Sequence, residues 1–161
     1  ERMVVYHGST IVVDKPIAAA GRERLDFGKG FYITDIKEQA EAWAKRMQRI
    51  RQKPGIVNVY ELDIDIVRSN FRYLHFDNYD NEWLQFIISN RTGVCAESFD
   101  VIEGGVANDR VVDTIEAYMA NLMPLDLALR ELAKHKPNNQ ICILSQKAID
   151  SCLRFVKHYN I

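Results

Sequence analysis

The sequence predicts a single α+β domain over residues 3–161. Short apolar runs typical of strands alternate with helical patterns, without the regular βαβ period that would favour a parallel sheet. The 161 residues are enough for one domain with its own core. A composition of 47% hydrophobic and 27% charged residues is ordinary for a globular protein. We therefore expect no second domain, repeat or linker.

The N-terminal part predicts two short strands joined by a long loop. Residues 3–7 and 31–34 are apolar runs of strand length, and residues 8–30 lie between them. A connection of this length in a small domain is usually functional. We expect it to form the mobile wall of a cleft.

A long helix is predicted to follow, because apolar side chains recur at helical spacing: Ile36, Ala40, Trp43, Ala44, Met47 and Ile50. Asp35 and Glu38 have the spacing of a capping box at its start. Its outer face is basic, with Lys37, Lys45, Arg46, Arg49, Arg51 and Lys53. A solvated helix face is the commonest explanation of such a charge run.

In the rest of the chain, the sequence predicts five strands and four helices that do not alternate regularly. Pro54 and Gly55 end the long helix. Expected strands cover residues 57–62, 70–76, 99–103, 141–144 and 154–159. Expected helices cover residues 82–90, 111–121, 125–135 and 148–153. The strand at 99–103 is expected to end at Gly104 and Gly105.

Charge and cysteine content narrow the class of protein. A formal net charge of −1 disfavours a nucleic-acid partner, although it leaves a local basic patch open. The sequence has no run of 18 apolar residues and no signal-peptide pattern, so we expect a cytoplasmic protein that does not enter membranes. Cys95, Cys142 and Cys152 form no C-x-x-C motif, and any disulfide would leave one of them unpaired. A protein of the reducing cytosol is the simpler interpretation. The four histidines lack metal-ligand spacing, so no metal is expected.

Two motifs carry the functional signal. The first is Tyr6-His7-Gly8-Ser9 at the end of the first strand, and the second is Asp26-Phe27-Gly28-Lys29-Gly30-Phe31-Tyr32-Ile33-Thr34. His7 can hydrogen-bond a hydroxyl, and Gly8 lets a ligand approach the backbone closely. Strand alternation places Phe31 and Tyr32 on opposite faces, so we expect one in the core and one in the cleft.

These motifs resemble the first two signature motifs of the ADP-ribosyltransferase superfamily, whose members split NAD. The resemblance implies two split antiparallel sheets with flanking helices. It also implies that His7 holds a ribose, the Gly8 backbone pairs with the carboxamide, Ser9 lies beside the nicotinamide, and Tyr32 stacks on its ring. NAD is then a substrate, and no metal is required.

The third motif departs from the better-known members of that superfamily. A late strand normally begins with a glutamate, but Asn138-Asn139-Gln140-Ile141-Cys142 carries Gln140 there. An amide can bind a ribose 2′-hydroxyl but supplies no charge and no base. The missing carboxylate could come from elsewhere, and Asp109, after Gly104-Gly105, is our candidate; it would otherwise cap the following helix.

Read together, these segments are similar to a small bacterial family long catalogued as a domain of unknown function within the same superfamily, in which glutamine in the third motif is usual. Its relatives include toxin and effector modules, often with a neutralising antitoxin. Arg22, Arg24 and Arg91 are candidate pyrophosphate contacts, because guanidinium groups bind phosphate in a planar geometry.

The sequence therefore predicts an NAD-dependent mono-ADP-ribosyltransferase of toxin type that modifies an unknown macromolecular acceptor. Two alternatives remain open. Gln140 favours a catalytically weak module that binds NAD or a protein. An RNA 2′-phosphotransferase is the other, and the near-neutral net charge counts against it.

Overall fold

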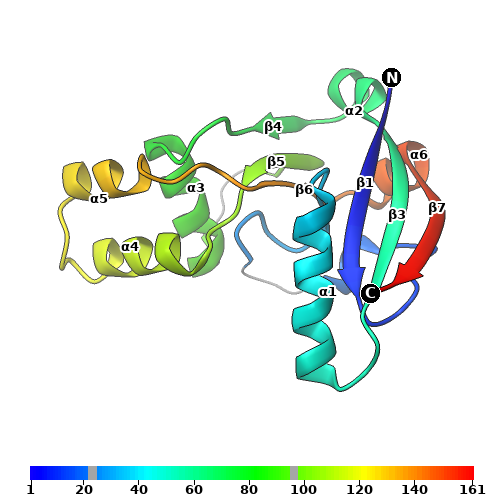
Figure 1. The fold of residues 1–161 in the computed structure, drawn as a ribbon. Coiled ribbons are helices and arrows are strands. Elements are labelled where there is room, and N and C mark those ends of the chain that lie inside the picture. Colours follow the sequence, from blue (N-terminus) through cyan, green and yellow to red (C-terminus); the bar gives the residue numbers. More distant parts are fainter. Residues whose placement is uncertain (22–24, 95–97) are drawn as a thin grey trace.

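Two small sheets, each flanked by helices, make up the fold (Figure 1). The computed structural model describes residues 1–21, 25–94 and 98–161. The first sheet has the order β1-β3-β7 and is antiparallel. The second has the order β2-β6-β5-β4, in which only the β4-β5 pair is parallel. This arrangement confirms the α+β prediction.

The strands are β1 (Arg2–Ser9), β2 (Phe31–Ile33), β3 (Ile56–Asp63), β4 (Tyr73–His75), β5 (Val101–Gly105), β6 (Asn139–Ile143) and β7 (Leu153–Asn160). The α-helices are α1 (Lys37–Arg51), α2 (Ile64–Asn70), α3 (Asn81–Thr92), α4 (Asp109–Met119), α5 (Leu125–Leu132) and α6 (Gln146–Cys152), and a 3₁₀ turn covers Ala18–Ala20. No helix within the described ranges is long and apolar enough to cross a membrane.

Two local expectations were wrong, and a third was displaced by two residues. Helix α2 was not anticipated; it follows β3 directly and is capped by Asp63, whose side chain accepts a hydrogen bond from the Ile66 amide at 3.3 Å. Strand β5 ends at its glycines as expected, with Gly104 and Gly105 as the last rungs of the ladder with β6, but it begins at Val101, two residues later than predicted. The capping box at α1 does not form: Ile36 occupies the N-cap position without a side-chain bond.

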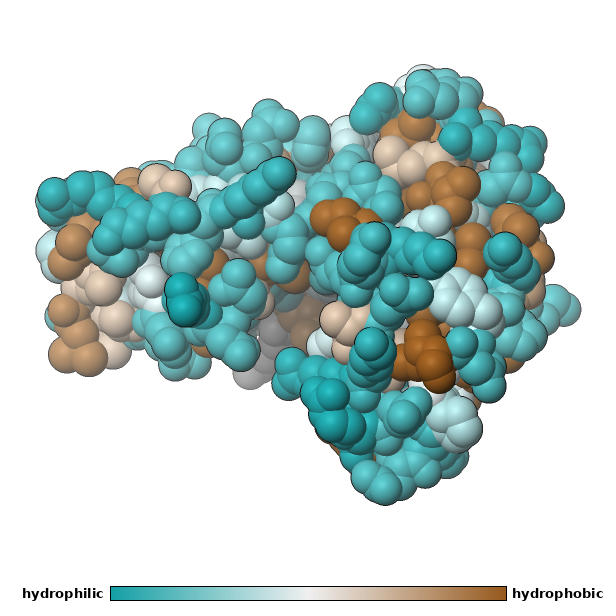
Figure 2. Space-filling model, viewed as in Figure 1, coloured by the Kyte–Doolittle hydropathy of each residue, from teal (hydrophilic) through white to brown (hydrophobic). Residues whose placement is uncertain are grey.

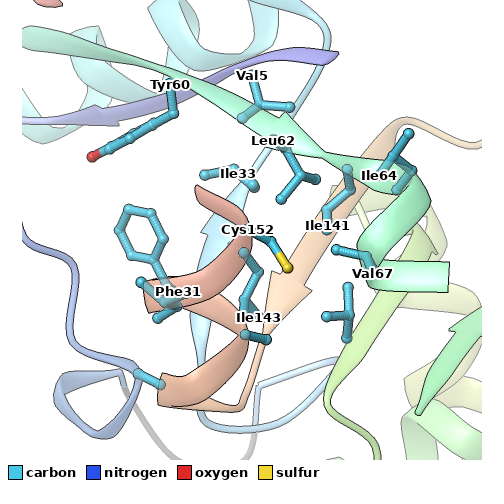
Figure 3. Close-up of a cluster of buried hydrophobic side chains, with 14 residues drawn as sticks. Val5, Phe31, Ile33, Tyr60, Leu62, Ile64, Val67, Ile141, Ile143 and Cys152 are labelled. Atoms are coloured by element: carbon cyan, nitrogen blue, oxygen red, sulfur yellow. The ribbon is translucent and has the colours of Figure 1, made fainter. Parts of the chain in front are cut away.

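The core between the two sheets is apolar and contiguous (Figure 3). Val5, Tyr60 and Leu62 of the first sheet face Ile33 and Ile141 of the second, and all five are essentially inaccessible to solvent. Burial at about 25 cal/mol per Å² of apolar surface makes this contact the main force that holds the sheets together. A second apolar cluster lies under α3, α4 and α5 and supports the far side of the β6-β5-β4 sheet.

One backbone contact joins the edges of the two sheets. Tyr6 in β1 and Thr34, just after β2, form an isolated antiparallel bridge, with N···O distances of 2.8 and 3.0 Å. The same two segments carry the first and second motifs. The bridge therefore brings the ends of those motifs side by side.

Gly8 fixes how closely α1 lies on β1. A Cβ added at Gly8 would lie 2.2 Å from the Ala40 carbonyl oxygen and 2.8 Å from the Ala44 amide nitrogen. Both atoms belong to helix backbone and cannot rotate away. The glycine that sequence reasoning assigned to ligand approach is thus also required for packing of the helix.

Gly8→Ala should destabilise the fold. Because the helix must move to admit the methyl group, we expect a loss of at least about 2 kcal/mol in the free energy of unfolding, the upper part of the usual range for overpacking. Urea denaturation of both proteins measures it. Ala42→Ser, an exposed change on the same helix, should shift the value by less than about 0.5 kcal/mol; equal effects of the two changes would contradict the packing argument.

Candidate active-site cleft at the junction of the two sheets

A cleft of about 580 Å³ opens where β1, β2 and the start of β6 meet. Its walls include both strand motifs, the N-terminal loop, one side of α1, and Val106 and Ala107 in the loop between β5 and α4. Six of the predicted site residues line it: His7, Gly8, Ser9, Tyr32, Arg91 and Gln140. A smaller hollow of about 290 Å³ between α3 and α5 contains none of the predicted site residues.

His7 is held in one tautomer. Its Nδ1 lies 2.7 Å from the Tyr32 carbonyl oxygen. Since a carbonyl can only accept, Nδ1 carries the proton and Nε2 of the neutral ring is an acceptor. Burial lowers the pKa of His7 below its usual 6.5, against the opposing effect of the Tyr32 carbonyl. At neutral pH the cleft therefore contains an uncharged imidazole.

The backbone of Gly8 is directed toward the cleft. Tyr6 turns its N–H and C=O groups away from β3 to bond Thr34. Strand geometry repeats every two residues, so Gly8 presents its own N–H and C=O to that same edge. Beyond the Tyr6–Thr34 bridge this edge of β1 borders the cleft, which gives a bound amide a backbone donor and acceptor.

Tyr32 and Phe31 lie on opposite faces of β2, as predicted. Phe31 is buried between the sheets against Tyr60, whereas Tyr32 is partly exposed and packs parallel to Phe27. The Tyr32 hydroxyl donates to the Gly28 carbonyl at 2.7 Å and accepts from the Phe27 amide at 3.1 Å. Burial raises the pKa of this phenol, so it stays protonated. Both Tyr32 and Phe31 contribute to the cleft wall.

Gln140 points into the cleft because its neighbour points the other way. Asn139 donates from Nδ2 to Glu103 at 2.9 Å and to Asp35 at 3.1 Å. Alternation along β6 then turns Gln140 to the cleft side, which it lines. Within the described part of the chain, the Gln140 amide has no side-chain hydrogen-bond partner. It is free to bind a ligand.

A buried carboxylate, Asp26, was missed by sequence reasoning. It is 7% exposed and lines the cleft. Its Oδ1 accepts from Nε and Nη2 of Arg91 at 2.8 and 2.7 Å, and its Oδ2 accepts from the Ala107 amide at 2.7 Å. Arg91 is therefore committed to an ion pair that ties the loop to α3. The sequence feature that could have pointed to Asp26 is its position as the first residue of the second motif, next to Phe27.

The other predicted residues fall elsewhere. Asp109 is exposed in the first turn of α4 and does not line the cleft. Nor does it cap that helix, because Asn108 accepts the bond from the Val111 amide at 3.0 Å. Arg22 and Arg24 lie outside the described residues. Among the described residues no group of three His, Cys, Asp or Glu side chains could hold a metal ion.

Acid should destabilise the protein through His7. The unfolded histidine has a pKa near 6.5 and the folded one a lower value, so the unfolded chain takes up the proton first. The stabilising contribution is complete above about pH 6.5 and is lost as the pH falls from there through the folded-state pKa. Urea unfolding at about pH 7.5 and 5.5 measures the change.

His7→Gln should remove part of that pH dependence, whereas His158→Gln, an exposed control on β7, should leave it intact. An identical pH profile in wild type and His7→Gln would show that His7 titrates alike in both states.

The sequence matches a family model described as a protein of unknown function, DUF3990, over residues 3–155. No curated protein and no solved structure matches it. The matched range contains every residue that lines the cleft. Because it spans nearly the whole chain, the protein belongs to the DUF3990 family.

Proposed function

We propose that the protein is an NAD-dependent mono-ADP-ribosyltransferase that acts on a macromolecule, with NAD bound in the cleft at the junction of the sheets. The observation that carries the proposal is the convergence of His7, Gly8, Tyr32 and Gln140 on one cleft, although Gln140 is more than a hundred residues from the others. A volume of about 580 Å³ lies in the usual range for small-molecule sites.

Each of these groups offers a contact suited to one part of NAD. The Gly8 backbone edge pairs with the carboxamide, and the Tyr32 ring stacks on the nicotinamide. Neutral His7 accepts a hydrogen bond from a ribose hydroxyl through Nε2, and the Gln140 amide forms a hydrogen bond with a ribose 2′-hydroxyl. Together these contacts fix both rings relative to the scissile bond.

The reaction needs little covalent help from the protein. The bond between ribose C1′ and the nicotinamide nitrogen breaks, and the electron pair leaves with nicotinamide. A nucleophilic oxygen or nitrogen of the acceptor forms the new bond at C1′ and loses its proton to solvent. Positive charge develops on the ribose meanwhile, and oriented dipoles such as the Gln140 carbonyl stabilise it.

A catalytically weak NAD-binding module is the second candidate function. Two observations favour it: Gln140 carries no charge, and the carboxylate in the cleft, Asp26, is already paired with Arg91. Isothermal titration with NAD, combined with assay of released nicotinamide, separates the two candidates. Binding without nicotinamide release, in the presence of cell lysate as a source of acceptor, would support the module.

Tyr32→Ala should weaken NAD binding by about 1 to 3 kcal/mol, the scale for loss of an aromatic stacking surface. Tyr32→Phe keeps the ring and removes only the hydroxyl, which donates to the Gly28 carbonyl and accepts from the Phe27 amide, so the loss of NAD affinity should be much smaller. Isothermal titration of both variants distinguishes stacking from loop anchoring. Wild-type affinity in Tyr32→Ala would refute the assignment of this wall to NAD.

Gln140→Glu should raise NAD hydrolysis. A full charge about 4 Å from the ribose is worth at most roughly 4 kcal/mol, or about a thousandfold in rate, and solvent in the open cleft reduces this to a gain on the order of tenfold. Asp109, exposed on α4, does not line the cleft and so should not oppose the gain by repulsion. Nicotinamide release is the readout, with Gln140→Ala as the matched neutral variant. Wild-type rates in both variants would place Gln140 outside the site.

A further inference from the structure

One wall of the cleft is built by helix α1 and is not used by the NAD contacts proposed above. Gln39, Ala40, Trp43 and Arg51 are its contributions to the cleft. Gln39 and Trp43 are four residues apart, so they lie one above the other on the same helical face. This face, with the exposed surface beside it, has three properties that together specify a ligand.

The first property is an unsatisfied donor. The Nε2 atom of Gln39 is buried and, within the described part of the chain, has no hydrogen-bond partner. It is the one such side-chain atom recorded among the described residues. A buried donor without an acceptor is costly and rare, so this one needs an explanation, and an acceptor on a bound molecule would supply it. The wall therefore calls for a ligand that carries a hydrogen-bond acceptor.

The second property is an exposed indole. Trp43 is 41% exposed at the mouth of the cleft, whereas Trp83, the other tryptophan of the chain, is fully buried. The Arg46 guanidinium lies 5.5 Å from the centre of the Trp43 ring. An aromatic ring beside a planar cation is a stacking surface for a flat, electron-rich ring.

The third property is uncompensated positive charge along the outer side of α1. Lys45, Arg46 and Arg49 of α1 and Lys53, just after its end, are all exposed, and none forms an ion pair with a described residue. Charged residues on α5 behave differently, since Arg130 pairs with Asp126. In Figure 2 the lower end of α1 is covered by hydrophilic side chains. Such a surface attracts phosphates even though the whole chain is nearly neutral.

We propose that this face of α1, defined by Gln39, Trp43, Arg46 and Arg49, binds a single-stranded nucleic acid, one base of which stacks on Trp43 at the mouth of the cleft. A base supplies a flat ring and hydrogen-bond acceptors for Gln39, and its strand supplies phosphates for the arginines. An acidic peptide would satisfy the cations but not the stacking surface. The surface deepens the proposed function, because a strand held there is the macromolecule presented to NAD.

Binding can be measured without NAD. Titration with single-stranded DNA or RNA of about 12 nucleotides, within the site sizes usual for such surfaces, should quench the fluorescence of exposed Trp43 and leave that of buried Trp83. Polyglutamate of similar length serves as the acidic-peptide probe. We expect quenching by an oligonucleotide, weakening steeply with added salt, and none by polyglutamate. The DNA and RNA arms identify which strand is preferred.

Variants locate the surface. Anisotropy of a labelled oligonucleotide should show at least about tenfold weaker binding for Trp43→Ala and for the pair Arg46→Glu with Arg49→Glu. Gln39→Leu should weaken binding without a change in salt dependence, because it removes a neutral contact. Arg130→Glu on α5 reverses one charge far from α1 and should bind normally, and Arg46→Glu alone is its matched single variant. Circular dichroism confirms folding of each.

Binding that is equally weakened by Arg130→Glu, or unaffected by Trp43→Ala, would overturn the proposal, as would tighter binding of polyglutamate than of either oligonucleotide. A separate result tests the proposed function. Oligonucleotide binding through α1 without calorimetric NAD binding would support the nucleic-acid surface and contradict the proposed enzyme. NAD binding without oligonucleotide binding would contradict only the nucleic-acid surface.

Discussion

The bridge between Tyr6 and Thr34 is the contact on which the rest of the site depends. It joins the edges of two sheets whose remaining contact is mainly the packing of apolar side chains. Because it occupies the edge of β1 at Tyr6, it also sets which backbone groups of β1 remain for a ligand two residues further on. The His7 bond to the Tyr32 carbonyl lies beside it and fixes the second strand in the same register. The position of the cleft, the free edge of β1 and the orientation of the His7 ring therefore all depend on the place where β1 and β2 meet.

Asp26 has the corresponding role for the loop wall. Its carboxylate bonds the Arg91 side chain and the Ala107 amide, and its carbonyl accepts from Asn90 at 2.9 Å. Three segments far apart in sequence thus meet on one buried residue. The earlier part of the loop is held separately, since Asn58 accepts from the Val13 amide at 2.8 Å and Gln146 bonds both Pro16 and Ala18. The described parts of this wall are thus fixed at several points, whereas the length of the loop predicts a mobile wall.

Sequence patterns predicted the structural features that depend on residues close to one another in the sequence. Strand alternation placed Phe31 and Tyr32 on opposite faces of β2, and helical spacing located α1 with its buried Ala40 and Ala44. Long-range features were not accessible in this way. The sequence contains nothing that shows Arg91 meeting Asp26, so Arg91 looked like a phosphate contact when a carboxylate already holds it.

Asp109 failed for a related reason: Asn108, one residue earlier, also caps well, and only the path of the chain after β5 decides between them. Helix α2 was missed because its seven residues bury only Ile64 and Val67, too few to show a period. Membership in ADP-ribosyltransferases remains a prediction.

The charges of the cleft suggest how such a site balances binding against turnover. Its charged lining residues within the described ranges are one carboxylate, Asp26, and two guanidinium groups, Arg51 and Arg91, which leaves a single net positive charge. His7 and Gln140 add dipoles but no charge. A surplus of positive charge favours the pyrophosphate of a dinucleotide, yet it opposes the positive charge that develops on the ribose during glycosidic cleavage.

A free carboxylate at the third motif would offset the positive charge of the cleft and so stabilise the charge that develops on the ribose. It would also favour hydrolysis of NAD by water. With Gln140, the developing charge is met by dipoles that act only at short range and in one orientation. In the proposed transferase, turnover would then depend on a nucleophile held in place by the rest of the surface rather than on the field of the cleft alone. A neutral third motif is therefore consistent with an enzyme whose activity is conditional on its acceptor.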